Sequence, residues 1–282
     1  MRITETAIPG LLIIDLDVHG DNRGWFKENW QREKLTELAP ELASFQPVQN
    51  NISYNHAGAT RGLHAEPWDK LVSVAQGKIF GAWCDLREGS ESFGEVVTHE
   101  VGPETAVFVP RGVANGFQAL EETSYCYLVN EHWSAEARYS AVNLDIVDWP
   151  LEPTEISEKD KQHPALKDVS PMPARRILVT GANGQLGRAL KRLLADAELC
   201  THADFDITDP PERNWKQYSA IINCAAYNDV NGAENDRAAA WAVNAEAPAR
   251  LARIAAENQL TLVHVSSDYI FDGTNAVSYT HL

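Results

Sequence analysis

The sequence predicts two domains of different class: an antiparallel β sandwich or barrel, followed by an α/β domain with a parallel sheet. The first half consists of short apolar or alternating runs separated by turn residues, whereas the second half alternates strand-like and helix-like runs. A stretch rich in proline and charge lies between them. A length of 282 residues also fits about two domains. We therefore assign 1–150 to the first domain, 151–175 to a linker and 176–282 to the second domain.

The first domain is predicted to consist almost entirely of strands. Only residues 32–42 look helical. Thr60 to Val74 also reads as strand, yet it contains Arg61, His64 and Lys70, which are costly to bury without partners. Their occurrence together suggests either a solvent-exposed strand edge or a functional site. The other predicted strands are LLIIDLDVH, VQNNISYN, KLVSVAQGKIFGAWCDL, VVTHEV, AVFVP and SYCYLVNEHW.

The second domain begins with the strand RILVTG and the amphipathic helix QLGRALKRLLADA. AIINCAA and LTLVHVSS are further buried-type strands, and the long segment ENDRAAAWAVNAEAPARLARIAAENQ between them is helical in pattern. Alternating β and α elements indicate a parallel sheet with crossover helices.

Composition excludes several classes of partner. The formal net charge of -16 argues against nucleic acid and anionic membranes, because either partner requires a basic face. Four cysteines without CxxC spacing indicate reduced thiols. The N-terminus fits neither a signal peptide nor a membrane span. We expect a cytoplasmic protein, in which local arginines and lysines must bind any anionic ligand.

A glycine loop is the main feature of the second domain. RILVTGANGQLGRAL places Gly181, Gly184 and Gly187 between a strand and a helix, where glycines let the backbone approach a pyrophosphate at a helix N-terminus. An ordinary tight turn is the alternative. The GxxGxxG spacing resembles the extended short-chain dehydrogenase/reductase family, and the later segments INCAAYNDV, AVNAEAP and VSSDYIFDG resemble dTDP-4-dehydrorhamnose reductases.

This resemblance implies a Rossmann-type fold that binds NADPH or NADH. The cofactor-binding residues that it implies are Gly181, Asn183, Gly184, Gln185, Leu186, Gly187, Asp206, Ile207, Ala225, Ala226, Asn244 and Ser267. The reductases also need a Tyr-x-x-x-Lys pair, yet neither Tyr269 nor Tyr279 is followed by such a lysine. We therefore expect an incomplete domain that binds a dinucleotide without transferring hydride.

Eight strings of the first domain occur in the order seen in dTDP-4-dehydrorhamnose 3,5-epimerases. They are DNRGWFKE, VQNNIS, TRGLH, DKLV, DLREGSESFG, VFVPRGVANGF, YCYLV and DWP. The resemblance covers about residues 1–150 and implies a metal-independent, cupin-like jelly-roll barrel. It also implies a homodimer formed by strand exchange at the barrel edge.

Epimerisation beside a ketone needs a base, an acid on the opposite face and a group that stabilises the enolate oxygen. By resemblance, His64 is the base, Tyr127 the acid and Lys70 the group near the oxygen. A histidine suits the first role because its usual pKa is near neutral. Each residue taken alone also has a structural explanation, such as a hydrogen-bonded core histidine. The substrate-binding residues that the family implies are Arg23, Glu28, Gln49, Asn51 and Arg61.

Two departures from the family stand out. Asn115 replaces a histidine, and the late segment that supplies an aspartate to the base is shortened to VNLDIVDWP. Asp145 is the nearest candidate for that aspartate, with Asp148 behind it. A metal site is disfavoured, because none of the nine histidines forms the HxH pair that cupin-type metal sites use.

The sequence thus predicts an epimerase acting at C3 and C5 of a dTDP-4-keto-6-deoxyhexose, fused to a partial reductase domain of the following step in dTDP-rhamnose synthesis. Two alternatives stay open. The second half could be a dinucleotide sensor or scaffold, or the whole chain could bind sugar nucleotides without turnover.

Overall fold

The computed structural model describes residues 1–135 and 137–266. The chain divides into two compact units, Met1–Ala174 and Arg175–Leu282.

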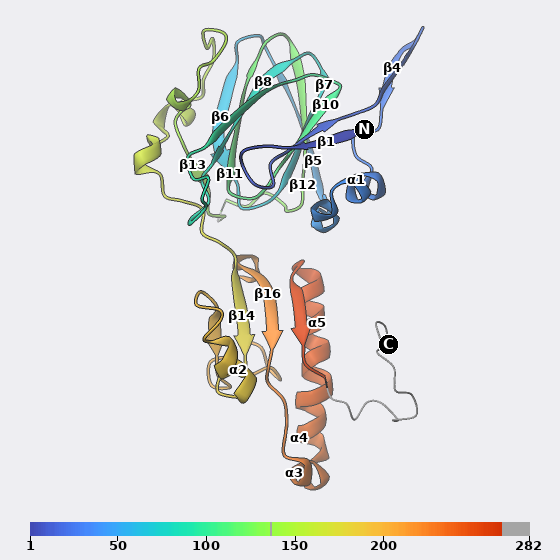
Figure 1. The fold of residues 1–282 in the computed structure, drawn as a ribbon, viewed down its shortest axis with the longest axis vertical. Helices are drawn as coiled ribbons and strands as arrows, with labels where there is room; N and C mark the ends of the chain where they lie inside the picture. The colour runs from blue at the N-terminus through green and yellow to red at the C-terminus, as the bar shows by residue number, and fades with distance from the viewer. Residues whose placement is uncertain (136, 267–282) are drawn as a thin grey trace. The chain divides into compact units, whose positions relative to one another are not determined.

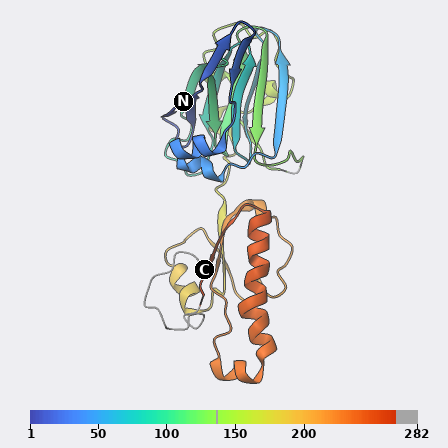
Figure 2. The same cartoon turned by 90° about the vertical axis from the view of Figure 1, so that its right-hand side faces the viewer.

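The first unit is built from two antiparallel sheets whose strands surround a common interior (Figures 1 and 2). The six-stranded sheet has the order β1 (Arg2–Glu5), β2 (Leu12–Asp15), β10 (Thr105–Val109), β7 (Lys70–Gln76), β12 (Thr123–Val129) and β5 (Gln49–Asn55). The five-stranded sheet has the order β13 (Ser140–Ala141), β6 (Thr60–Ala65), β11 (Val113–Ala119), β8 (Ile79–Asp85) and β9 (Val96–Val101).

Side chains from both sheets fill the interior between them. Val72 and Val107 come from the six-stranded sheet, Trp83 and Phe117 come from the five-stranded sheet, and all four are buried. Phe117 stacks on Tyr125 with ring centroids 4.2 Å apart. These apolar contacts hold the two sheets together, and they leave one part of the interior open for a site.

The predicted helix at 32–42 is confirmed in part. It forms α1 (Arg32–Leu38) and then the 3-10 helix η1 (Pro40–Ser44). Pro40 has no backbone N–H to continue α1, which ends before it. Leu35 and Leu42 pack with Phe45 and Phe108 in a second buried cluster beside the six-stranded sheet.

The predicted linker at 151–175 differs most from the expectation. Residues 151–174 belong to the first unit and contain the short 3-10 helices η3 (Asp160–Gln162) and η4 (Leu166–Asp168). Ile156, Leu166 and Val169 pack on a cluster of the five-stranded sheet that also includes the 3-10 helix η2 (Leu144–Ile146). Scattered apolar side chains therefore fix a segment whose overall composition is typical of a linker.

A two-stranded hairpin, β3 (Val18–Asp21) and β4 (Gly24–Lys27), lies outside both sheets. β4 projects away from the barrel (Figure 1). Trp25 is 48% exposed and Phe26 is 65% exposed. The hairpin thus presents two large apolar side chains that its own unit does not cover.

The second unit contains the parallel sheet that the sequence predicts. Its order is β15 (Glu198–Cys200), β14 (Arg176–Thr180), β16 (Tyr218–Asn223) and β17 (Thr261–His264). The helices are α2 (Gln185–Leu190), η5 (Trp215–Gln217), α3 (Val230–Asn235), α4 (Arg237–Trp241), the π-helix η6 (Ala242–Glu246) and α5 (Ala247–Glu257).

Helix α5 runs along the sheet (Figure 2) and buries Ala247, Leu251 and Ala255 against it. These residues are spaced four apart, as one face of an amphipathic helix requires. α2 is shorter than the predicted run QLGRALKRLLADA, because its last regular turn ends at Leu190 and turns follow. In the described part of the chain, we find no helix with the length and apolar character of a membrane span.

Candidate active site

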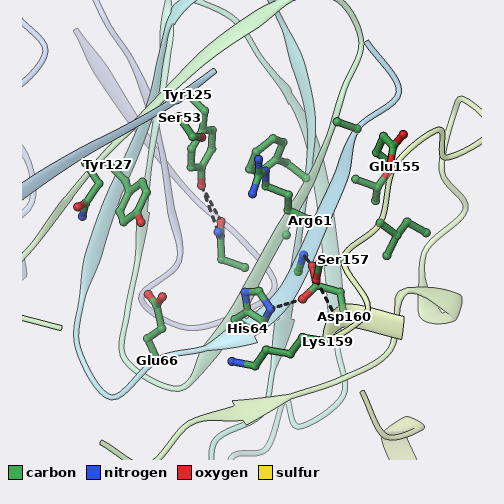
Figure 3. A pocket seen from close by; sticks show the side chains of 18 of the residues that line it. Ser53, Arg61, His64, Glu66, Tyr125, Tyr127, Glu155, Ser157, Lys159 and Asp160 are labelled. Atoms are coloured by element: carbon green, nitrogen blue, oxygen red, sulfur yellow. Dashed lines mark hydrogen bonds and ion pairs between the residues drawn. The ribbon is translucent and has the colours of Figure 1, made fainter. Parts of the chain in front are cut away.

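A cavity of about 660 Å³ opens between the two sheets of the first unit. Strands of the six-stranded sheet supply Asn51, Lys70 and Tyr127, and β6 of the five-stranded sheet supplies Arg61 and His64. Glu155, Ser157, Lys159 and Asp160 complete one wall from the segment that was expected to be a linker (Figure 3). The cavity therefore draws charged groups from both sheets and from 155–160.

Strand β6 places His64 in this cavity, and Gly62 makes that placement possible. Gly62 has a φ of +111°, and a Cβ there would lie 2.5 Å from Cα of Gly116 on the neighbouring strand β11. Only glycine allows such a close approach of two backbones. The RGLH string is thus explained as a strand that presses against β11 and then turns the imidazole into the cavity.

His64 is paired with Asp160. Its Nε2 lies 2.8 Å from Oδ1 of Asp160, whose other oxygen accepts a hydrogen bond of 3.2 Å from the backbone N–H of Gly62. The side chain of His64 is 36% exposed, whereas that of Asp160 is 6% exposed. Burial alone would raise the pKa of Asp160, but the hydrogen bond and charge of His64, together with the Gly62 N–H and the charge of His163, outweigh burial and lower it. An ionised carboxylate is therefore fixed behind the imidazole.

The expectation that Asp145 orients His64 is wrong. Asp145 lies in η2, and its Oδ2 accepts a hydrogen bond of 3.3 Å from Asn143. Asp145 and Asp148 are not among the described residues that line the cavity. Asp160 takes the expected place because residues 151–160 fold back onto the barrel, where Thr60 N donates a 2.9 Å bond to Glu155 O.

Tyr127 and Lys70 face His64 from the opposite sheet. Lys70 Nζ lies 2.5 Å from Oε2 of Glu66 and 4.7 Å from the centroid of the Tyr127 ring. Lys70 is buried, at 6% exposure, so the ion pair with Glu66 supplies the partner that its ammonium needs. Burial raises the pKa of Tyr127, and the charge of Glu66 raises it further. Tyr127 therefore keeps its proton at neutral pH.

The five residues predicted to bind substrate separate into two groups. Asn51 and Arg61 line the cavity, and Arg61 Nε donates a 2.7 Å bond to Asn55. Gln49 is not a lining residue of the described chain, although its Nε2 donates a 2.8 Å bond to Asn51. Arg23 and Glu28 lie away from the cavity of their own chain, on the hairpin or just after it, and pair with Asp21 and Lys34.

Asn115 is built into a hydrogen-bonded network. Its Oδ1 accepts a 2.9 Å bond from Nε1 of Trp83, and its Nδ2 donates a 3.1 Å bond to the hydroxyl of Tyr125. Asn115 also lines the cavity, at 8% exposure. The asparagine that replaces the histidine of the family thus satisfies two buried groups, and burial raises the pKa of Tyr125.

A second histidine stands behind the pair. The rings of His163 and His64 are in T-shaped contact with centroids 5.0 Å apart, and Nε2 of His163 lies 3.8 Å from Oδ1 of Asp160. One group of side chains in the described chain has the spacing to hold a metal ion. It consists of His64, Asp160 and His163, whose possible ligand atoms all lie within 4.8 Å of one another. Burial lowers the pKa of His163, and the neighbouring His64 lowers it further.

The second unit has the strand, turn and helix of the predicted glycine loop. Gly181 has a φ of +68°, and a Cβ there would lie 2.6 Å from the backbone N of Ala225. A Cβ on Gly187 would lie 2.5 Å from the carbonyl oxygen of Gly181. These two glycines are therefore required by close backbone packing at the end of β14.

The remaining predicted cofactor residues are partly explained by local bonds. Asp206 accepts bonds of 2.8 and 2.7 Å from the N–H and hydroxyl of Thr208, which lower its pKa. Asn244, in the π-helix, accepts a 2.8 Å bond from Tyr227 N and so ties η6 to the segment after Ala225 and Ala226. Asn183 precedes α2, Gln185 and Leu186 begin it, and Ile207 is buried in the core. Ser267 lies outside the described residues.

Comparison with known families identifies the first unit. The family described as dTDP-4-dehydrorhamnose 3,5-epimerase matches residues 5–168, more than half of the chain. The chain belongs to this family. The match extends through Asp160 and His163, so the segment that closes the cavity is part of the epimerase unit.

Solved and curated epimerase relatives agree with this assignment. The chain is 51% identical over 176 residues to the RmlC homologue of Streptococcus pyogenes, which covers 58% of this chain and 89% of that protein. The structure of RmlC from Streptococcus suis in complex with dTDP-D-xylose aligns with a TM-score of 0.57 and 48% identity, over 61% of this chain and 94% of that one. The first unit therefore has the RmlC-like cupin fold that the sequence predicts.

The second unit matches the RmlD substrate binding domain over residues 175–282. Over 106 residues it is 47% identical to the dTDP-4-dehydrorhamnose reductase of Mycobacterium tuberculosis. This alignment covers 36% of the present chain and 35% of the reductase. The chain therefore spans about a third of the length of that reductase, and its reductase domain is partial.

Sequence reasoning missed Asp160, Lys159, Ser157 and Glu66 as site residues. The first three lie in the segment assigned to a linker, where charge obscured the pattern. One local signal was present: Ser157 Oγ accepts a 3.1 Å bond from Asp160 N, and serine three residues before an aspartate is a common turn or cap pattern. Glu66 lies between His64 and Lys70, in the strand-like segment from Thr60 to Val74.

Proposed function

We propose that the first unit epimerises a dTDP-4-keto-6-deoxyhexose at C3 and C5 by removing a proton on one face of the sugar and returning one on the other. One observation carries this proposal. His64 and Tyr127 enter the same cavity from opposite sheets, so a sugar ring bound between them presents one face to each. Epimerisation requires this two-sided arrangement of base and acid.

The chemistry of each group fits its role. Asp160 accepts the Nε2–H of His64, which leaves the lone pair of the other ring nitrogen free to take a proton from carbon. As the imidazolium forms, the ionised Asp160 stabilises its positive charge. Tyr127 keeps a proton that it can return to the other face. The ammonium of Lys70 is poised to stabilise negative charge on the ketone oxygen.

The same cavity can bind the nucleotide part of the substrate. Arg61 and Lys159 are exposed cations on its wall, and Asn51 adds an amide. Guanidinium and ammonium groups bind phosphate oxygens strongly, which offsets the net charge of -16 for a diphosphate ligand. The RmlC of Streptococcus suis is similar to this unit and was solved with dTDP-D-xylose, which supports a dTDP sugar as the ligand class.

Deuterium exchange tests the proposal. The protein is incubated in D2O with dTDP-4-keto-6-deoxyglucose, and NMR follows deuterium at C3 and C5. Enzymatic exchange is expected, and His64→Asn should slow it by at least about 10²-fold. His56→Asn is the matched control, because the His56 side chain is 78% exposed and pairs with Glu122. Exchange at the buffer rate in the unaltered protein would instead favour a sugar-nucleotide-binding protein without turnover.

For the second unit we propose dinucleotide binding at the glycine loop, with NADPH or NADH as the cofactor. The positive φ of Gly181 and the close packing at Gly187 fit a backbone that must approach a pyrophosphate. NADPH fluorescence should change on titration with the protein. Gly184→Val should weaken binding, because a Cβ at Gly184 would lie 3.3 Å from the carbonyl oxygen of Gly181 and the valine would crowd the loop. We expect no NADPH consumption by this chain. Equal binding by the variant would place the cofactor elsewhere, and no binding by the unaltered protein would contradict the proposal.

We also propose that the protein forms a homodimer through the β3–β4 hairpin. Arg23 is 90% exposed in its side chain and sits on the same hairpin as the exposed Trp25 and Phe26. An exchanged hairpin would bury these apolar side chains and carry Arg23 and the adjacent Glu28 toward the cavity of a second copy. This arrangement would reconcile their predicted role in substrate binding with their distance from the cavity of their own chain.

A further inference from the structure

We propose that His64, Asp160 and His163 form a binding site for a divalent transition-metal ion, best suited to Zn²⁺, and that the bound ion switches the epimerase off. The inhibitory effect rests on the proposed function, whereas the binding site itself does not. The ion is proposed as an inhibitor and not as a catalytic cofactor. Catalysis needs a free lone pair on the His64 imidazole, and metal binding would make that lone pair unavailable.

The geometry of the three side chains carries the site. One ligand atom from each residue lies within 4.8 Å of the other two. Nε2 of His64 is 2.8 Å from Oδ1 of Asp160, and Nε2 of His163 is 3.8 Å from the same oxygen. Ligands of tetrahedral zinc at ordinary bond lengths are about 3.3 Å apart. Small side-chain movements therefore bring two imidazoles and one carboxylate around a single ion.

His163 supplies the third possible metal ligand, beside His64 and Asp160. Its side chain is only 7% exposed, and its Nδ1 is buried without a hydrogen-bond partner among the described residues. Asp160 already accepts bonds from Gly62 and His64, and the reaction proposed above assigns no role to His163. A second buried imidazole aimed at the same carboxylate is the donor that a metal site adds.

The donor set selects the class of ion. Two imidazole nitrogens with one carboxylate oxygen suit Zn²⁺, Co²⁺ and Ni²⁺, whereas Mg²⁺ and Ca²⁺ prefer oxygen ligands. His64 and Asp160 both line the cavity, which gives the ion a path from solvent. A fourth position facing the cavity is left for water, as in three-ligand zinc sites.

Metal binding at Nε2 of His64 disables the base for a simple reason. In the metal-free protein the ionised Asp160, 2.8 Å from Nε2, favours the tautomer with its proton on Nε2, which leaves the lone pair on Nδ1. When an ion takes the lone pair of Nε2, the neutral imidazole must carry its proton on Nδ1. The nitrogen that would accept the substrate proton is then protonated, so proton abstraction stops.

Direct metal binding is the first test, because it does not depend on turnover. The protein is titrated with CoCl2, and visible absorption bands of bound Co²⁺ report tetrahedral coordination by nitrogen and oxygen; calorimetry with ZnCl2 gives the affinity. Wild type is expected to bind one ion without the near-ultraviolet bands of a thiolate ligand. His163→Phe, which keeps an aromatic ring against His64, should bind at least about tenfold more weakly. MgCl2 should give no signal.

The second test measures deuterium exchange from the sugar during zinc titration. Exchange by wild type should fall as the site fills and return with EDTA, whereas His163→Phe should start at the wild-type rate and resist zinc by at least about tenfold. His56→Asn should stay as sensitive as wild type. If His163→Phe does not fold by circular dichroism, His163→Asn replaces it.

The outcomes separate the site from the function. Zinc binding that depends on His163 in a protein without exchange activity would support the metal site and refute the proposed epimerase. Exchange activity with no zinc binding, or with binding that His163→Phe and His163→Asn leave unchanged, would refute the site. If zinc fills the site while deuterium exchange continues at the full rate, the proposed inhibitory effect of the ion is refuted.

Discussion

Nε2 of His64 lies 2.8 Å from Oδ1 of Asp160, although 96 residues separate them in the sequence. Asp160 is 5% exposed and its pKa is lowered, because the bond and charge of His64, with the Gly62 N–H and His163, outweigh burial. The carboxylate is therefore a fixed negative charge behind the imidazole. It selects the ring tautomer whose free lone pair points away from Asp160 and toward the cavity.

Asp160→Asn should lower kcat for epimerisation by about 10²-fold with a smaller change in KM. The amide keeps the shape of the side chain but cannot stabilise the imidazolium that forms when His64 takes a proton. Steady-state kinetics checks this expectation. Asp145→Asn is the matched control and should stay within about twofold of wild type, since Asp145 bonds only locally to Asn143. The reverse ranking of the two variants would restore Asp145 as the partner of His64.

Tyr127→Phe should separate proton removal from epimerisation. The variant keeps His64 and Asp160, so deuterium should still enter the substrate from the His64 face. Delivery of a proton to the other face should slow by at least about 10²-fold, because the phenol is gone. NMR of the sugar distinguishes exchange with retained configuration from inverted product. Tyr54→Phe, a 60% exposed tyrosine outside the cavity lining, should behave as wild type. Equal loss of both processes would show that Tyr127 is not the acid.

Lys70→Met should affect both stability and rate. Removing the ammonium leaves Glu66 without its ion-pair partner in a mostly buried position, which should cost about 3 kcal/mol of unfolding free energy. The double variant Lys70→Met/Glu66→Gln should recover most of that stability while exchange stays slower by about 10²-fold or more. Urea unfolding and exchange assays measure the two effects separately. Recovery of the rate together with stability would show that Lys70 is only structural.

Lys78→Met is the control for this series. Lys78 pairs with Glu100 across 3.3 Å, and both side chains are about half exposed. An exposed ion pair of this kind contributes about 0–1 kcal/mol, so neither stability nor rate should change appreciably.

Strand patterns and motif order predicted the cupin barrel, but they did not show which turn-like residues lie in strands. β11 contains Gly116 and Asn115 and reads as a turn, yet all seven of its residues are buried. Gly116 is needed there because a Cβ would lie 2.8 Å from the carbonyl oxygen of Arg61. Such a requirement comes from the neighbouring strand and is not visible in local sequence.

Sequence reasoning missed Asp160, the partner of His64, for a related reason. The stretch from 151 to 175 is dominated by charge and proline, so averaged composition indicates a linker. Four apolar side chains of this stretch, Ile156, Leu166, Val169 and Met172, are packed or buried against the barrel, and backbone bonds such as Thr60 N to Glu155 O add to them. Leu166, Val169 and Met172 recur every three residues, but Ile156 stands ten residues before them, so no run is long enough to indicate a helix or a strand, and only the tertiary fold brings all four to one surface.

Phe26→Ser should shift the protein from dimer toward monomer. Phe26 is 65% exposed on the projecting hairpin, and an exchanged hairpin would bury it. Analytical ultracentrifugation measures the association. Leu193→Ser is the matched control, because Leu193 is 78% exposed in the second unit and should not alter the dimer. Arg23→Ala should raise KM for the sugar nucleotide without dissociating the dimer, as expected if this arginine contacts the diphosphate in a second copy. A monomeric wild type would contradict the hairpin exchange.

Asp85 should stabilise the first unit down to an unusually low pH, and this contribution should be lost only as pH falls toward 2. Burial alone would raise the pKa of Asp85, but hydrogen bonds from Arg87, Ser92 and Ser90 outweigh burial and lower it from 3.8 to about 2. Arg87 Nε and Nη2 donate bonds of 2.9 and 2.7 Å to the two oxygens of this fully buried carboxylate. The folded state therefore favours the ionised form more than the unfolded chain does.

Because the folded pKa is depressed, the contribution of Asp85 is fully present above pH 4 and disappears as pH falls toward 2. A shift of this size corresponds to about 2 kcal/mol. Asp85→Asn should thus destabilise the protein at neutral pH by about 2–4 kcal/mol, because Arg87 loses its counter-charge, and the difference from wild type should shrink between pH 4 and 2. Asp15→Asn, at an exposed pair with Arg2, is the control. Urea unfolding measures the free energy of unfolding of both proteins across this pH range. A difference between wild type and Asp85→Asn that stayed constant with pH would contradict the lowered pKa of Asp85.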